Sequence, residues 1–296
     1  MATLYGQNLR ILLGTYVVAK ATSCQISMTN EAESSSSKDD VGLVDKQDVV
    51  KKSWSVQVDS LDVSDVGSIM SGIKNKEKFM VIWDETSTTN NQSTLGADFS
   101  QMGFAYITDA TFVFNNRTIS TKSLTLTGSS ALTSNSQAMT LASAGTITRG
   151  QYVRLYLSSN STDTPIKVIG AAENLQLHVS CTVEDVSTKD TVGDYVINEV
   201  TAISYDITTE ALVRSGETIT SLVAAQDLTS ITNIYKAGLP VKWQIANVSG
   251  DNNRTKGTVL ASGLVQITQL QISAQNRQRS TYNATMQGYG EYNVGS

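Results

Sequence analysis

Hydrophobic and polar residues alternate along most of this chain with the period of two that marks half-buried β-strands. Residues 54–59 and 203–208 each place apolar side chains at every second position and polar ones between them. Side chains of a strand point alternately to its two faces, so each stretch predicts one buried and one solvated face. Four further stretches follow the pattern, namely residues 103–114, 123–127, 264–272 and 283–287. The chain is therefore predicted to be mainly β.

The longest of these strands is rich in aromatic residues. Strict alternation over residues 103–114 predicts that one face of the strand carries Phe104, Tyr106, Phe112 and Phe114.

Helical spacing occurs in two regions only. Residues 64–73 carry apolar side chains three and four positions apart, which predicts one helix. In the later region, Ser215 could cap a helix over residues 217–223, and a further helical stretch is expected near residues 231–236. Gly238 and Pro240 then end it.

The chain also repeats itself. Residues 24–61 align without a gap with residues 175–212, and residues 81–128 with 241–288, so that Trp83 matches Trp243. Repeated strand patterns separated by loops of unequal length are typical of two homologous units. We predict two tandem β-sandwich or partial-barrel domains, each with one flanking helix. Their bounds are residues 1–130 and 149–296, with a linker at 131–148.

Composition and charge exclude several function classes. Of the 296 residues 40% are hydrophobic and 17% are charged, and 22 basic residues spread along a chain of net charge −5. A tight nucleic-acid binder would need a basic stripe. No apolar run reaches the roughly 18 residues of a membrane span, so no membrane partner is expected. Residues 10–24 only imitate an export signal, because Thr15, Tyr16 and Lys20 interrupt the apolar stretch.

Few residues could support catalysis or metal binding. The two cysteines, Cys24 and Cys181, are not equivalent in the repeats, and no CxxC or histidine-rich spacing is present. The single histidine, His178, aligns with Ser27 and lies between apolar strand residues, which predicts a surface or packed side chain. No GxSxG, HExxH, Walker-type or GxGxxG motif occurs. We expect structural thiols, no catalytic residue, no metal and no cofactor, in a protein that is not an enzyme.

Two long polar excursions interrupt the strands, at residues 31–52 and 184–201. Each lies between alternating stretches, which predicts a long hairpin whose tip is outside the core. Serine and charge at a hairpin tip are usually plain solvated loop, but the two tips share sequence, which favours contact with a neighbouring molecule. The candidate contact residues are Ser34, Ser37, Lys38, Asp39, Asp40, Gly42, Ser187, Lys189, Asp190 and Gly193.

Several features follow one another in a fixed order in this chain. Residues 17–27 precede the Ser/Lys/Asp-rich excursion ending at Val41-Gly42. Residues 52–61 around Trp54 come next, then a helix, residues 79–83, and residues 103–108 with a closing strand. This order resembles the major tail tube proteins of long-tailed bacteriophages. Both halves show it, so the resemblance covers almost the whole chain. It implies a virion tail protein that assembles in the host cytoplasm.

The resemblance also implies how the protein assembles. Subunits of that family form six-fold rings around one inner barrel, and the long hairpin reaches the adjacent ring. A duplicated chain then implies three copies per ring; six copies, with the second half as outer decoration, is the alternative. The implied partners are further copies of this chain, other tail proteins (tape measure, terminator and distal tail proteins), and DNA in transit. Candidates for the inner surface or ring edge are the acids Glu31, Glu33, Glu184 and Asp185, because an acidic lining lets DNA slide.

Two other functions stay open from the residues alone. A tandem β-sandwich binding module, such as an adhesin or lectin, would be a monomer with an aromatic-lined pocket. A tail or capsid decoration protein would share the virion setting without stacking on itself.

Overall fold

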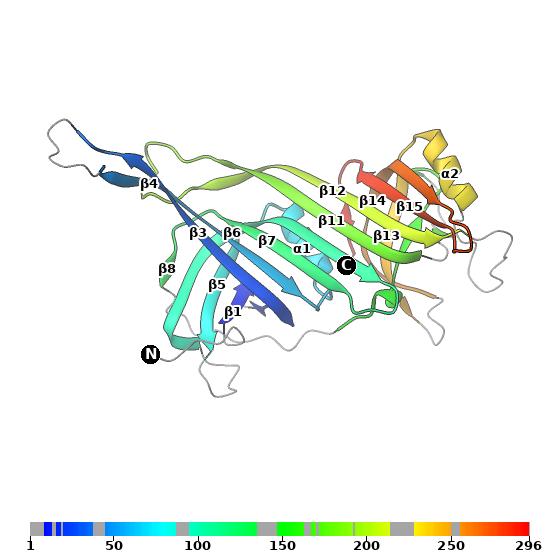
Figure 1. Cartoon of the computed structure of the whole chain (residues 1–296), viewed down its shortest axis with the longest axis horizontal. Helices are drawn as coiled ribbons and strands as arrows, with labels where there is room; N and C mark the ends of the chain where they lie inside the picture. Colours follow the sequence, from blue (N-terminus) through cyan, green and yellow to red (C-terminus); the bar gives the residue numbers. More distant parts are fainter. Residues whose placement is uncertain are drawn as a thin grey trace.

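A computed structural model describes most of the chain. It covers residues 9–13, 16–18, 20–37, 45–86, 95–134, 147–162, 167–169, 172–191, 193–213, 228–249 and 255–295. The described residues are mainly antiparallel β-sheet with two α-helices (Figure 1). The predicted mainly β class, with a helix in each half, is confirmed.

The elements fall into two series along the chain. The first half, residues 9–134, contains β1 (Leu9–Leu13), β2 (Tyr16–Val17), β3 (Ala21–Ser34), β4 (Gln47–Ser60), α1 (Val66–Lys74), β5 (Phe79–Thr86), β6 (Leu95–Asn115), β7 (Thr121–Gly128) and β8 (Thr133–Ser134). The second half, residues 147–295, opens with a short 3₁₀ turn, Gly150–Tyr152. It then contains β9 (Val153–Leu157), β10 (Lys167–Val168), β11 (Ala172–Asp185), β12 (Asn198–Leu212), α2 (Leu228–Ala237), β13 (Val241–Ser249), β14 (Thr255–Ser273), β15 (Thr281–Gly288) and β16 (Asn293–Val294).

The two halves pair their strands in the same way. In the first half the neighbours are β2–β1–β5–β6–β7–β4–β3, with β8 also on β6. In the second half they are β10–β9–β13–β14–β15–β12–β11, with β16 also on β14. The registers agree as well, down to the bulge after Glu31 in β3 and the bulge after Thr182 in β11. Residues at matching places in these ladders are called equivalent below.

The sequence match of Trp83 with Trp243 is wrong by two residues. Trp83 pairs with Ile11 of β1, whereas the equivalent place opposite Leu155 of β9 is occupied by Ile245. A shift of two residues keeps a side chain on the same face of a strand. Both indoles still contact an aromatic ring of another strand: Trp83 contacts Trp54, and Trp243 contacts Tyr205.

The predicted single aromatic face of residues 103–114 is also wrong. A bulge between Ile107 and Asp109 of β6 shifts the alternation by one residue. Phe112 and Phe114 are buried with Ala105, while Phe104 is exposed on the opposite face. A local insertion of this kind leaves no mark in a strict period-two pattern.

Other local predictions agree with the structure. Helix α1 lies where residues 64–73 predict it, and α2 contains the predicted stretch at 231–236. The helix expected over residues 217–223 lies outside the described residues. Both excursions emerge from long hairpins, β3–β4 and β11–β12, and Figure 1 shows the paired ends of β3 and β4 projecting beyond the rest of the molecule.

A large aromatic side chain on the long hairpin of each half packs directly against a glycine of the neighbouring strand. Trp54 of β4 lies over Gly128 of β7, where an added Cβ would overlap the indole ring. Tyr205 of β12 lies in the same way over Gly288 of β15. Both rings are buried, so the absence of a side chain at each glycine provides the space they occupy.

Candidate assembly interface

The two halves are joined edge to edge. Residues 109–115 of β6 pair antiparallel with residues 174–180 of β11, so that one connected sheet passes from the first half into the second. We call this contact the in-chain seam. One edge of β6 pairs with β7. On the opposite edge, β5 pairs with the first part of β6, up to Ala105, and β11 pairs with the last part, from Asp109.

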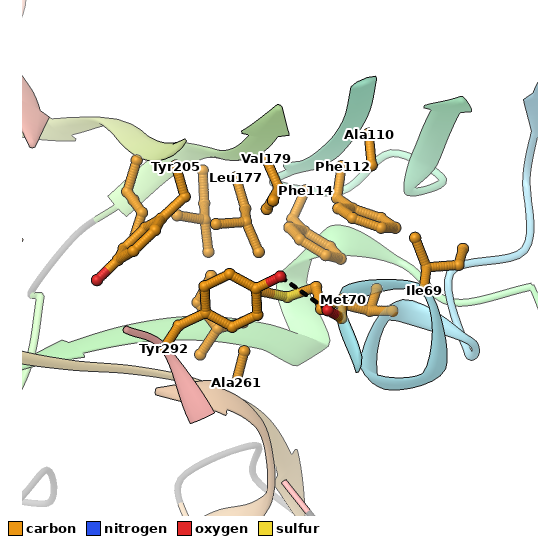
Figure 2. Close-up of a cluster of buried hydrophobic side chains, with 14 of the residues drawn as sticks. Ile69, Met70, Ala110, Phe112, Phe114, Leu177, Val179, Tyr205, Ala261 and Tyr292 are labelled. Atoms are coloured by element: carbon orange, nitrogen blue, oxygen red, sulfur yellow. Dashed lines mark hydrogen bonds between the residues drawn. The ribbon is translucent and has the colours of Figure 1, made fainter. Parts of the chain in front are cut away.

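One face of the in-chain seam is apolar and fully buried. Three cross-strand pairs form it: Leu175 with Phe114, Leu177 with Phe112, and Val179 with Ala110. Figure 2 shows the phenyl rings of Phe112 and Phe114 beside Leu177 and Val179 in one cluster. Burying such pairs provides the main driving force for holding two sheet edges together.

Helix α1 covers this apolar face and contacts the second half. The Tyr292 hydroxyl donates a hydrogen bond of 2.7 Å to the Met70 carbonyl (Figure 2). Lys74 in the last turn of α1 donates to the Tyr292 carbonyl at 2.8 Å. The seam is therefore two layers deep, with strands above and a helix below.

The opposite face of the seam carries one histidine between two carboxylates. His178 of β11 lies 2.7 Å from an Asp206 oxygen through Nδ1 and 2.6 Å from an Asp109 oxygen through Nε2. Asp206 belongs to β12 and Asp109 to β6, so the imidazole bridges the two halves. We call these three residues the histidine clamp. A carboxylate only accepts hydrogen bonds, so His178 can donate to both of them at once only in its charged form, with a proton on each ring nitrogen.

The clamp shifts the titration of its histidine. Partial burial lowers the pKa of His178, but the hydrogen bonds with Asp109 and then Asp206 raise it by more, so the net pKa is above the usual value. A histidine whose pKa is raised on folding stabilises the fold below its unfolded pKa, near 6.5. That stabilisation is lost as the pH rises through the folded pKa.

We expect His178→Ser, which copies the equivalent Ser27, to lower stability more at pH 6 than at pH 9. Charge-assisted hydrogen bonds at a partly exposed site suggest that the substitution lowers the free energy of unfolding by about 1 kcal/mol at pH 6. Denaturant unfolding of both proteins at the two pH values measures it. Equal differences at both pH values would contradict the charged clamp.

The second excursion is fastened to the first half. Lys51 and Lys52 of β4 form ion pairs of 2.9 Å with Asp185 and 2.8 Å with Asp194. The backbone of Lys52 also donates to Asp194 and accepts from Val196, at 2.7 and 3.0 Å. These contacts hold the base of the second hairpin along β4.

Asp185 is part of this attachment. Hydrogen bonds from the Ser187 hydroxyl and backbone, followed by Lys51, hold the pKa of its carboxyl at about 2. The other three candidate acids, Glu31, Glu33 and Glu184, are exposed. A lining role for these four acids stays a prediction.

The candidate hairpin residues occupy exposed positions where they are described. Ser34 ends β3, Ser37 follows it, and Lys189 and Asp190 lie in a turn of the second excursion. The Ser187 hydroxyl accepts from Ile197 N–H at 3.0 Å, just as Ser36 accepts from Lys46 at 2.8 Å. Gly193 has a φ of 92°, a conformation that favours glycine. Lys38, Asp39, Asp40 and Gly42 lie outside the described residues.

Both thiols are partly buried and unpaired with each other. Burial raises the pKa of Cys24, and burial followed by the Asp109 charge raises the pKa of Cys181 to about 11. A thiol with a raised pKa holds little thiolate at neutral pH and is a poor nucleophile. This environment suits two structural side chains.

The described part of the chain offers neither a metal site nor a membrane-spanning helix. It contains no group of three or more His, Cys, Asp or Glu side chains able to hold a metal ion. Neither of its two helices has the length and apolar character that crossing a membrane requires.

Sequence reasoning missed the histidine clamp. Asp206 lies directly opposite His178 in the β11–β12 hairpin, so an assumed hairpin register could have found that pair. Asp109 comes from the other half, and no local pattern points to it. The ion pairs of Lys51 and Lys52 were missed for the same reason.

The solved structures that are similar to this chain in fold include the following three. Two contain gene transfer agent (GTA) particles. A chain of the native virion is 14% identical with a TM-score of 0.38, and one of the empty particle's tail, refined with C6 symmetry, is 13% identical with a TM-score of 0.39. Each match covers 50% of this chain and 99% of the other. The SPP1 tail tube is 14% identical over 50% of this chain and 78% of that one, with a TM-score of 0.34.

Comparison by sequence gives no match of this kind. No model of a known protein family matches the chain, and no curated protein does.

Proposed function

We propose that this chain is a tail tube protein, a structural component of a virion whose stacked rings form the conduit for DNA ejection. Three copies make one ring, and the two halves of each copy occupy two of its six equivalent positions. The order of features along the sequence supports the family, and the way the two halves join supports the ring. The protein acts by assembly and carries out no catalysis.

The observation that carries the proposal is the in-chain seam. The second half adds β11 to the edge of β6, and it keeps an equivalent edge on β14 at its own far side. The same addition can therefore be repeated by another copy. A head-to-tail contact that repeats with a constant rotation closes into a ring, and closure pairs the open edge of β14 in every copy.

The chemistry of the sheet's polar face suits an inner surface. Opposite the apolar core, the central strands present hydroxyl, amide and acidic groups, among them Thr111, Gln176, Ser204 and Thr208. DNA bound by many lysines or arginines would be retained, since every phosphate contact adds affinity. A neutral to acidic surface lets DNA pass, and the acids at residues 31, 33, 184 and 185 extend it to the ring edge.

Electron microscopy of the purified chain tests this proposal. We expect rings or stacked tubes, and a ring mass of three chains by native mass spectrometry. A ring of six chains would show that the two halves of one copy do not both occupy positions in the ring wall. A solitary particle under every condition tried would overturn the tail tube proposal and favour a monomeric binding module.

Stacking is assigned to the two excursions, residues 34–42 and 187–193. The described ends of β3 and β4 are exposed and project beyond the rest of the chain (Figure 1), a position suited to reaching the next ring. Other tail components, such as tape measure, terminator and distal tail proteins, would meet the tube at its ends in the virion. Assembly is proposed to occur in the host cytoplasm.

Deleting residues 34–41 should abolish tube growth while leaving the rings intact. Residues 34–37, the described part of the deleted segment, are exposed, so the deletion is expected to change the free energy of unfolding by less than about 0.5 kcal/mol. Electron microscopy distinguishes tubes from single rings, and circular dichroism checks the fold. Tubes of normal length from the deletion variant would remove the excursion from the stacking contact.

A further inference from the structure

Two open strand edges, on β3 and β14, are the counterparts of the two strands in the in-chain seam. Residues 23–29 of β3 are equivalent to residues 174–180 of β11, and residues 269–273 of β14 to residues 109–113 of β6. In the seam each of these strands has a neighbour on both sides. Among the described residues, β3 pairs only with β4, and residues 269–273 pair only with β15.

Apolar side chains that the seam buries are exposed at the open edges. Phe112 and Val179 are 0% exposed, whereas the equivalent Ile272 and Met28 are 53% and 63% exposed. Val200 of β12, which lies beyond the seam, is 8% exposed, and its equivalent Val49 of β4 is 40% exposed. A folded protein rarely leaves equivalent apolar positions both in the core and in water unless a partner covers the second set.

Helix α2 is also more exposed than α1 at equivalent positions. When α1 and α2 are aligned on Ile69 and Ile231, Ile73 corresponds to Tyr235. Ile73 is 3% exposed beneath the in-chain seam, and Tyr235 is 44% exposed. Lys74, which binds the carbonyl of Tyr292, corresponds to the exposed Lys236. The open edge of β14 and the exposed side of α2 therefore both lack a partner, and they lie at the same end of the molecule.

We infer that β14 of one copy binds β3 of the next copy in the register of the in-chain seam. Ile272 then lies opposite Ile26, Leu270 opposite Met28, and Gln271 opposite Ser27. Helix α2 covers the apolar side and meets residues 131–134 of the next copy, the counterpart of residues 291–294. This inference rests on the proposed ring and specifies how its copies join.

The contact between copies differs chemically from the seam within the chain. The positions of Asp109, His178 and Asp206 are taken by Gln269, Ser27 and Ser55, so no histidine clamp forms there. Backbone hydrogen bonds and apolar burial remain as its sources of affinity. Such a contact is insensitive to pH across the range in which histidine titrates.

Disulfide trapping tests the register. In a chain whose Cys24 and Cys181 are replaced by serine and alanine, we introduce Ser27→Cys with Gln271→Cys. Directly opposed strand residues have Cα atoms about 4.5–5.5 Å apart, within the reach of a disulfide. The control combines Ser27→Cys with Ser273→Cys, whose Cα atoms lie diagonally, at about 7–8 Å, beyond easy reach.

Oxidation of the assembled protein should give covalent dimers and trimers for the 27–271 pair and none for the 27–273 pair. Reductant should return both to single chains. Rings seen by electron microscopy that are trapped by the control pair, or by neither pair, would overturn this register and leave the tail tube proposal standing. A purified chain that forms no rings and no cross-links would overturn both.

Discussion

Phe112→Ala is expected to lower the free energy of unfolding by about 3–5 kcal/mol, the usual cost of emptying a buried phenylalanine site. Phe112 is fully buried, pairs with Leu177 across the in-chain seam and lies in the cluster above α1 (Figure 2). Its removal opens a cavity at the contact between the two halves. Denaturant unfolding measures the loss, and a change below about 1 kcal/mol would mean that the seam does not stabilise the fold.

The chain supplies a matched control for this substitution. Ile272 is the equivalent residue of the second half and is exposed, so Ile272→Ala should cost the isolated chain less than about 0.5 kcal/mol. If β14 binds a second copy, the same substitution weakens assembly. Phe112→Ala thus acts on folding and Ile272→Ala on association, although the two positions correspond.

Gly128→Ala is expected to destabilise the first half by about 3 kcal/mol, at the upper end of overpacking effects. The new Cβ would overlap the indole of Trp54, which cannot simply turn away, because Nε1 donates to the Ser130 carbonyl at 2.8 Å. For a chain of 296 residues the melting temperature should fall by about 5 °C. Calorimetry measures this shift.

A second substitution separates this overlap from other effects of alanine. Trp54→Leu shortens the side chain above Gly128, so the double variant Trp54→Leu with Gly128→Ala should be more stable than the sum of the single losses predicts. Residues in direct contact are expected to couple in this way. If the losses of the two single variants simply add in the double variant, the cost of Gly128→Ala does not come from overlap with Trp54.

Local side-chain patterns predicted the elements of this fold well. Period two marked the core face of β4 and β12, and helical spacing marked α1, because both depend only on neighbouring residues. The bulge in β6 and the two-residue displacement of Trp83 were missed. Each depends on how one strand lies against another, and the residue types at those places fit either arrangement.

The sequence alone determined that this protein is mainly β, that two stretches of it are alike, and that its hairpins end in polar tips. The tertiary structure decided that the halves join through β6 and β11, that His178 bridges them, and that β3 and β14 are left with open edges. Strand periodicity is carried by side chains and is visible locally. Edge pairing is made by backbone groups that every residue except proline possesses, so the paired strands are decided only when distant segments meet.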